Sequence, residues 1–182
     1  MNNARLDFLD ARPIVIAIAG SNGVGKSMFY YSHLPNTSLR FINADDLAHE
    51  LKLSAYDSAA VAAELRNALI SKRESFIFET VLSDPVGDKV NLLRDAADRG
   101  YEVILIFVWI ADVESSIQRV SMRVAQGGHD VPDNKLRERF NRTRKNLQRA
   151  IESLPHVLIY DNSDLTQPYR LMASYENGRL IK

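Results

Sequence analysis

Residues 14–27 read Ile-Val-Ile-Ala-Ile-Ala-Gly-Ser-Asn-Gly-Val-Gly-Lys-Ser. The apolar run Ile14–Ala19 follows Pro13, and its β-branched residues are typical of a strand that is buried on both faces. The next eight residues match the Gly-x4-Gly-Lys-Ser pattern of a phosphate-binding loop, after which a helix should begin near Lys26. Strand, glycine-rich loop and helix in this order predict an α/β protein with the P-loop NTPase fold.

The chemistry of this loop indicates nucleotide binding. Its glycines allow backbone N–H groups to converge on phosphates without interference from a Cβ atom. Lys26 supplies positive charge to the β- and γ-phosphates, and the Ser27 hydroxyl is the expected Mg²⁺ ligand. Met28 is expected to pack against the sheet beside the nucleotide. The alternative is a chance match in a glycine-containing turn. The residues predicted to bind ATP or GTP from this segment are Gly20, Ser21, Asn22, Gly23, Val24, Gly25, Lys26, Ser27 and Met28.

Apolar runs of strand length alternate with segments of helical periodicity along the rest of the chain, a pattern that favours a parallel sheet with helices on both faces. The expected strands are residues 14–19, 39–43, 75–79, 102–110 and 157–160. The expected helices after the first are residues 57–72 with Ser58 as N-cap, 86–99 closed by Gly100, a helix capped by Asp112 that runs to 125, and 133–152. Asn177-Gly178 between two short apolar runs predicts a C-terminal β-hairpin.

Size and composition fit one soluble domain that spans residues 1–182. The chain has 23 Lys plus Arg and 23 Asp plus Glu, so no charge excess indicates nucleic acid or an anionic membrane. It contains no Cys, which fits a cytoplasmic protein. The longest apolar runs, Ile14–Ala19 and Val103–Ile110, are too short to span a bilayer. The amino terminus carries Asp7 and Asp10 and lacks the apolar core of a signal peptide.

Carboxylates follow three of the expected strands, at the edge where an open parallel sheet binds its ligands. Asp45 and Asp46 follow the second strand, and Asp45 is the first choice for the base that orients an acceptor hydroxyl and takes its proton. Either aspartate could instead cap a helix at 47–51. Asp161 is expected to start a turn that borders the nucleotide base.

Glu79-Thr80, after the third strand, offers a carboxylate and a hydroxyl as candidate substrate-binding groups; alternatively, the carboxylate bonds only a nearby loop. No acidic residue of Walker B type follows the apolar strand in the middle of the chain, because Phe107–Ile110 leads to Ala111. This argues against a large mechanical ATPase.

The segment 119–150 is expected to form a helical lid. It has nine basic and three acidic residues, a local net charge of +6, and two helices flank its Gly127-Gly128 loop. Arginines at helical spacing share a face, and guanidinium groups suit the phosphoryl group in transfer. A solvated helix face or a contact with nucleic acid through Arg137 and Arg144 are the alternatives. His129 could touch substrate or make a structural hydrogen bond. The candidate lid arginines are Arg119 and Arg123 on the first helix and Arg139 and Arg142 on the second.

Four motifs taken together resemble the zeta-toxin family of P-loop kinases, in particular its short, free-standing bacterial members. They are residues 18–27, Ile42–Ala48, Phe78-Glu79-Thr80 and the Gly127–Pro132 loop. The ending 160–163 and the C-terminal hairpin are similar too. The resemblance implies an ATP- and Mg²⁺-dependent kinase that phosphorylates a small-molecule hydroxyl, with UDP-N-acetylglucosamine as the family's substrate class, and it implies a possible antitoxin partner.

By this resemblance, Asp45 is the catalytic base, Lys26 the phosphate lysine and Ser27 the metal ligand. Arg123 with Arg139 or Arg142 would steady the transferring phosphate, and Glu79 and Thr80 would touch the substrate. Two other functions remain open from the residues alone: a kinase of another metabolite (a nucleotide, a sugar acid or an antibiotic alcohol), and a nucleotide-binding regulatory module without transfer activity.

Overall fold

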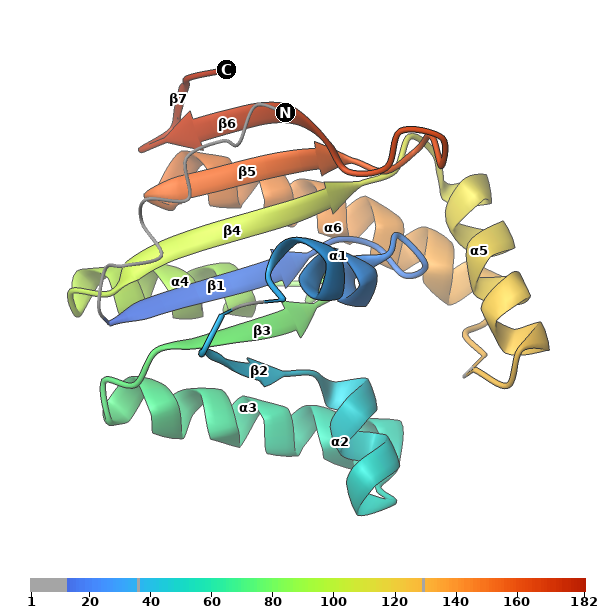
Figure 1. Ribbon diagram of the computed structural model, residues 1–182, viewed down its shortest axis with the longest axis horizontal. Coiled ribbons are helices and arrows are strands. Elements are labelled where there is room, and N and C mark those ends of the chain that lie inside the picture. Colours follow the sequence, from blue (N-terminus) through green and yellow to red (C-terminus); the bar gives the residue numbers. More distant parts are fainter. Residues whose placement is uncertain (1–12, 36, 129) are drawn as a thin grey trace.

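The computed structural model describes residues 13–35, 37–128 and 130–182. Within these residues, seven strands form one sheet in the order β2-β3-β1-β4-β5-β6-β7 (Figure 1). The parallel strands are β1 (Ile14–Ala19), β2 (Arg40–Ile42), β3 (Phe76–Thr80), β4 (Glu102–Trp109) and β5 (His156–Asp161). The antiparallel strands are β6 (Arg170–Glu176) and β7 (Arg179–Leu180), which meet at Asn177-Gly178. The predicted five-stranded parallel sheet with a C-terminal hairpin is confirmed.

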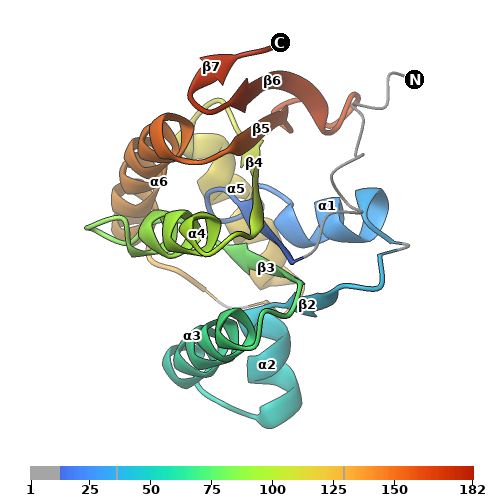
Figure 2. The same cartoon turned by 90° about the vertical axis from the view of Figure 1, so that its left-hand side faces the viewer.

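Helices cover both faces of the sheet, as Figure 2 shows edge-on. One face is covered by α3 (Ala55–Ser71), α4 (Asp88–Asp98) and α6 (Asp133–Ser153), and α1 (Lys26–His33) lies on the other. Alternate residues of β1 enter the two resulting cores, with Val15 in one and Ile16 in the other. Since both faces are covered, the fully apolar sequence of β1 is explained, and none of its residues is exposed.

The two remaining helices, α2 (Ala44–Leu51) and α5 (Val113–Ala125), lie near the carboxyl ends of the parallel strands (Figure 1). Two predicted helix starts were wrong. Helix α2 begins at Ala44, because Asn43 is its N-cap and its side chain accepts a hydrogen bond from the Asp45 N–H. Helix α3 is capped by Ser54, whereas Ser58 is buried one turn further on.

The order of the strands decides where a ligand can bind. Strand β1 lies between β3 and β4, while the chain crosses from β1 to the outer strand β2 before it returns to β3. A parallel sheet has its ligand crevice beyond the carboxyl ends of its strands, at such a reversal of strand order. No helix of the described residues is long and apolar enough to cross a membrane.

Candidate active site

The loop between β1 and α1 follows a path that only glycine permits at two close approaches. Gly20 has φ +144°, and a Cβ atom there would lie 2.4 Å from the carbonyl oxygen of Val108 on β4. Gly25 has φ +91°, and its Cβ would lie 2.7 Å from the Tyr169 hydroxyl. The neighbouring strand and the residue before β6 therefore pack directly against the loop.

Side chains from distant parts of the sequence hold the carbonyl groups of this loop. The Ser116 hydroxyl donates to Asn22 O at 2.7 Å. The Asn162 amide donates to Val24 O at 2.8 Å, and the Tyr169 hydroxyl donates to Gly25 O at 2.9 Å. Because the carbonyls of Asn22, Val24 and Gly25 accept hydrogen bonds from the protein itself, the protein holds this loop in shape.

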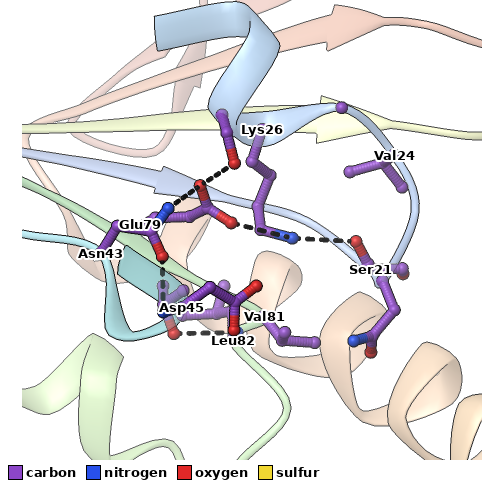
Figure 3. Close-up of polar contacts among 12 residues, drawn as sticks. Ser21, Val24, Lys26, Asn43, Asp45, Glu79, Val81 and Leu82 are labelled. Carbon is purple, nitrogen blue, oxygen red and sulfur yellow. Dashed lines mark hydrogen bonds and ion pairs between the residues drawn. The ribbon is translucent and has the colours of Figure 1, made fainter. Parts of the chain in front are cut away.

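Lys26 and Glu79 meet at the mouth of the loop (Figure 3), and Ser27 joins them through a hydrogen bond. The Ser27 hydroxyl donates to Glu79 Oε2 at 2.7 Å, and Lys26 Nζ lies 3.7 Å from Glu79 Oε1. Lys26 Nζ also donates to Ser21 O at 3.1 Å. Burial lowers the pKa of the Lys26 ammonium, although the carboxylates of Glu79 and Asp45 act in the opposite direction. The ammonium is thus held beside carboxylates in a largely dry position.

Glu79 occupies this place because of strand register. It pairs with Ile18 across β1 and β3, so it stands beside the start of the phosphate loop. Its carboxylate bonds the P-loop serine, which is the geometry of a Walker B acid. The sequence did not reveal this contact of Glu79 with Lys26 and Ser27. A contact of Glu79 with the substrate stays a prediction.

Asp45 and Asp46 lie in the first turn of α2 and face different neighbours. The charge of Asp45 acts on the pKa of Lys26, whereas the charge of Asp46 is the main cause of the raised pKa of the Tyr31 hydroxyl on α1. Burial and the nearby carboxylates of Glu79 and Asp45 raise the pKa of Asp46. Neither aspartate is the N-cap of α2. Asp45 is therefore the member of the pair whose charge acts on the phosphate lysine.

The loop after β3 borders Asp45 (Figure 3) and is fastened to α6. The Thr80 hydroxyl accepts from the Leu82 N–H at 3.2 Å, so it shapes this loop. From α6, Thr143 donates to Val81 O and Asn146 donates to both Leu82 O and Asp84 O, at 2.8–2.9 Å. We refer to Asp45, Thr80 and residues 81–84 as the acceptor side of the site.

Thr143 and Asn146 were not singled out from the sequence. Both are polar residues on the sheet-facing side of a basic helix, with exposed fractions of 0% and 2%. That position within the helical pattern is the only signal that could have revealed them, because a buried polar side chain requires a hydrogen-bond partner.

The four candidate lid arginines have different surroundings. The charge of Arg123 is among the causes that lower the pKa of Lys26, so it lies within electrostatic range of the phosphate lysine. Arg119 Nη2 donates to Asn162 O at 2.8 Å and thereby supports the 162–169 segment. Arg142 Nε donates to Ser83 O at 2.8 Å, and its Nη1 lies 3.6 Å from Glu138. Arg139 makes no hydrogen bond or ion pair with any residue in the described ranges.

Other predicted residues lie elsewhere or have structural partners. Met28 is 63% exposed, so the prediction that it packs on the sheet was wrong; Phe29 fills that place with 2% exposure. His129 lies outside the described residues. Arg137 bonds Glu114 of α5 with Nη2 to Oε2 at 3.0 Å, and Arg144 lies between the rings of Trp109 and Phe140. The two arginines considered for nucleic acid are thus engaged within the protein.

Asp161 starts a turn, as its sequence context indicates. Its Oδ1 atom accepts from the Ser163 N–H at 2.9 Å and from the Ser163 hydroxyl at 2.6 Å. These bonds to Ser163 lower the pKa of the Asp161 carboxyl. The turn sets the position of Asn162, which supports the phosphate loop.

The strand order, the glycine-rich loop between β1 and α1, and the two helices α5 and α6 at the carboxyl edge define the fold of the P-loop kinases. Within this class, the sequence profile of the zeta toxin family matches residues 40–172. The chain belongs to the zeta toxin family.

The individual proteins that this chain resembles share 25% or less of its sequence. An uncharacterized protein of Haemophilus influenzae is 25% identical over 130 residues, which cover 69% of this chain and 91% of the relative. The AvrRxo1-ORF1:AvrRxo1-ORF2 complex with sulphate ions has a similar chain at a TM-score of 0.68 and 18% identity, with 96% of this chain and 62% of that one covered. The PezAT toxin–antitoxin system of Streptococcus pneumoniae follows at a TM-score of 0.63 and 19% identity, with 91% and 72% covered.

These structural likenesses concern the fold, since identity is below 25%. The chain spans about three fifths of the AvrRxo1 chain that it resembles. Shikimate kinase from Acinetobacter baumannii, at a TM-score of 0.51 with 15% identity, covers 77% of this chain and has 82% of its own length covered.

Proposed function

We propose that the protein is a small-molecule kinase that transfers the γ-phosphoryl group of ATP, or GTP, to a hydroxyl group. The observation that carries this proposal is the convergence of Lys26, Ser27 and Glu79 at the mouth of the phosphate loop, with the charge of Asp45 acting on Lys26. This arrangement has a donor half, which suits a triphosphate, and an acceptor half, which contains a carboxylate. An ATP complex of the similar AvrRxo1 chain supports ATP as the donor.

The residues present fit a magnesium ion. Mg²⁺ prefers oxygen ligands and usually keeps several waters, so a hydroxyl, a carboxylate and substrate phosphates suffice. The described residues contain no cluster of three or more His, Cys, Asp or Glu that could hold a metal alone. Ser27 and Glu79 would hold the ion, and its charge would neutralise the negative charge that develops on the phosphates.

Asp45 would act on the acceptor. Its carboxylate orients the substrate hydroxyl and takes the proton as the hydroxyl oxygen forms its bond to the γ-phosphorus and the bond to the ADP oxygen breaks. Lys26 stabilises the charge on the phosphoryl oxygens throughout. Only the phosphoryl group and one proton change places, so no further reactant is required.

The lid segment 119–150 would close over the nucleotide within one domain of residues 1–182. The charge of Arg123 already acts on Lys26. Arg139 forms no hydrogen bond or ion pair with the described residues, so its guanidinium group could bind the phosphoryl group. Arg142 would contribute its remaining Nη2 group, and Arg119 would border the nucleotide through the 162–169 segment. Closure excludes water and so strengthens the electrostatic interactions at the phosphoryl group.

For the acceptor we propose UDP-N-acetylglucosamine or a related sugar nucleotide, in keeping with the family. Another metabolite, such as a nucleotide, a sugar acid or an antibiotic alcohol, is the alternative. The similarity to a toxin–antitoxin system supports a second possibility, in which an antitoxin protein holds this chain inactive.

The deciding experiment incubates the protein with γ-labelled ATP and Mg²⁺, first with UDP-N-acetylglucosamine and then with a cell metabolite extract. We expect label to enter a small molecule. Asp45→Asn should lower the rate about 10²–10⁴-fold while ATP still binds, because only proton acceptance is lost. Lys26→Ala should abolish both ATP binding and phosphoryl transfer.

The matched control is Asp98→Asn, an exposed aspartate on the distal helix α4, which should leave the rate unchanged. Full transfer by Asp45→Asn would exclude this residue as the base. Nucleotide binding without transfer to any metabolite would instead favour a regulatory module.

A further inference from the structure

A buried arginine lies in the middle of α3, on the side that faces the sheet. Arg66 has an exposed fraction of 8%, and its neighbours one turn before and one turn after it on the same side, Ala62 and Leu69, are exposed by 2% and 3%. Phe78 of β3 lies beneath it, with the guanidinium carbon 5.1 Å from the ring centroid. A position in such an apolar row is ordinarily occupied by Leu or Met.

The buried Nε atom of the guanidinium group has no polar partner among the described residues. Across residues 13–35, 37–128 and 130–182, no hydrogen bond or ion pair joins Arg66 to another residue, and its Nε atom is fully buried without one. Burial lowers the pKa of the guanidinium below its ordinary value. Other buried polar side chains on this face do have partners, as Thr143 and Asn146 show.

The direction of the side chain leads toward the acceptor side of the site. Helix α3 runs antiparallel to β3, and its first turn lies at the carboxyl edge of the sheet (Figure 1). Helical side chains lean toward the N-terminus of their helix, and the residues there on the same side are small, Ala62 and Ser58. Phe78 and Thr80 are two residues apart on β3, so both side chains stand on the face where the guanidinium lies.

An unpaired guanidinium in this place is costly to the folded protein. Removal of the charge from water is strongly unfavourable unless the group is paired, and one contact with a phenylalanine ring offsets only part of that cost. Five N–H donors in a planar fork are suited to two oxygens of a phosphate or a carboxylate. A ligand oxygen anion would supply the partner that the protein lacks.

We propose that Arg66 binds an anionic group, a phosphate or a carboxylate, of the acceptor substrate. This inference rests on the proposed kinase function and narrows its acceptor to a molecule with a hydroxyl group near Asp45 and an anionic group on the Phe78–Thr80 face. The carboxylate of Asp45 would repel an anion, so the hydroxyl end of the acceptor, near Asp45, and its anionic end, near Arg66, are distinguished by charge.

The first experiment does not require a known acceptor. The protein is saturated with Mg²⁺ and a non-hydrolysable ATP analogue, which fills the phosphate loop, and inorganic phosphate or citrate is then titrated while Tm is recorded. We expect wild type to gain Tm with one of these anions, and Arg66→Met to weaken the apparent Kd by about tenfold or more. Phosphate and citrate distinguish a phosphate-bearing from a carboxylate-bearing acceptor.

Two further variants sharpen the result. Arg66→Lys retains the charge without the fork and should bind the anion more weakly than wild type. Arg94→Met, on the exposed side of α4, should behave as wild type. In anion-free buffer without nucleotide, Arg66→Met should have a Tm equal to or above that of wild type, because an unpaired charge is removed.

The outcomes separate the two proposals. If the nucleotide raises Tm in every variant but the anion response is absent or does not depend on Arg66, the role of Arg66 is excluded and the kinase proposal stands. A fall in Tm, or failure to fold, for Arg66→Met without ligands would assign the arginine a structural role and overturn the inference. If the nucleotide stabilises none of the variants, the kinase proposal itself fails.

With the acceptor in hand, Arg66→Met should raise its KM about tenfold or more while kcat changes by less than about threefold, since the anion contact is the same in substrate and transition state. The KM for ATP should not change. An equal loss in the KM for both substrates would contradict the assignment.

Discussion

Glu79, near the end of β3, forms hydrogen bonds with residues from two other parts of the chain. It accepts hydrogen bonds from Ser27, 52 residues earlier in the sequence, and from Asn43, the N-cap of α2, at 3.4 Å. Because Asn43 is also the N-cap of α2, this bond connects the Glu79 carboxylate with the start of the helix that carries Asp45. One side chain thus connects Ser27, the proposed metal ligand, with the helix that carries Asp45, the proposed base.

Glu79→Gln should raise the Mg²⁺ concentration needed for half-maximal phosphoryl transfer about 10- to 100-fold, because an amide can bond Ser27 but carries no charge for the ion. The measurement is the rate of transfer across a Mg²⁺ titration at saturating ATP. Excess Mg²⁺ should restore part of the rate. A variant with an unchanged Mg²⁺ titration would remove Glu79 from the metal site.

Asp46→Asn should raise the free energy of unfolding at pH 7 by less than about 1 kcal/mol, the range of a solvent-exposed charge interaction. The folded protein holds the pKa of Asp46 above its ordinary value of 3.8, so the ionised carboxylate disfavours the folded state. As the pH falls through the raised pKa, the folded form takes up the proton first and this penalty disappears.

Chemical denaturation of wild type and Asp46→Asn at several pH values measures the effect. The gain should be present at pH 7 and absent below 3.8, whereas Asp98→Asn should show no such trend. A gain that grows toward acid pH would contradict the assigned cause. Phosphoryl transfer by Asp46→Asn should persist, in contrast to Asp45→Asn.

At the scale of elements, α6 serves two parts of the molecule. Its amino-terminal half carries Arg139 and Arg142, and its middle holds the 81–84 loop through Thr143 and Asn146. The same helix therefore connects the lid segment with the acceptor side. Leu82 on this loop has φ +59°, an uncommon conformation for a leucine, which the bonds from α6 keep in place.

Asn146→Ala should lower the free energy of unfolding by about 2–3 kcal/mol, because it leaves the carbonyls of Leu82 and Asp84 without a donor. Urea denaturation measures it, with Gln148→Ala on the exposed side of the same helix as control. The KM for the acceptor should rise more than the KM for ATP. If the free energy of unfolding of Asn146→Ala equals that of wild type within experimental error, water replaces the amide as the donor to both carbonyls without cost.

Elements of the fold were largely predictable because each one carries a local signal. The β-branched run before the glycine loop, the Asp112 cap and Asn177-Gly178 all act within a few residues, and the structure agrees with them. Contacts between side chains that are far apart in the sequence carry no local signal, so the sequence could not show that Glu79 bonds Ser27. Nor could it show that Met28 turns outward while Phe29 packs, since a one-residue shift in helical phase decides between them.

The whole molecule responds to its nucleotide through the loop at the centre of the sheet. Mg·ATP at about 100 times its Kd should raise the free energy of unfolding by about 2.7 kcal/mol, because only the folded sheet offers the site. Thermal unfolding with and without Mg·ATP measures this, and Lys26→Ala should lose the gain while Lys145→Ala, on α6, retains it. Equal stabilisation of Lys26→Ala would place the nucleotide elsewhere.

Ser116, Asn162 and Tyr169 hold three carbonyls of the phosphate loop before any ligand arrives. Because this loop is already ordered, nucleotide binding to it costs little further conformational entropy. The rate of nucleotide capture should then be governed by diffusion and by charge, and slow rearrangement should be confined to the lid. Stopped-flow binding would show this as an initial phase that rises linearly with nucleotide concentration, followed by a phase that does not.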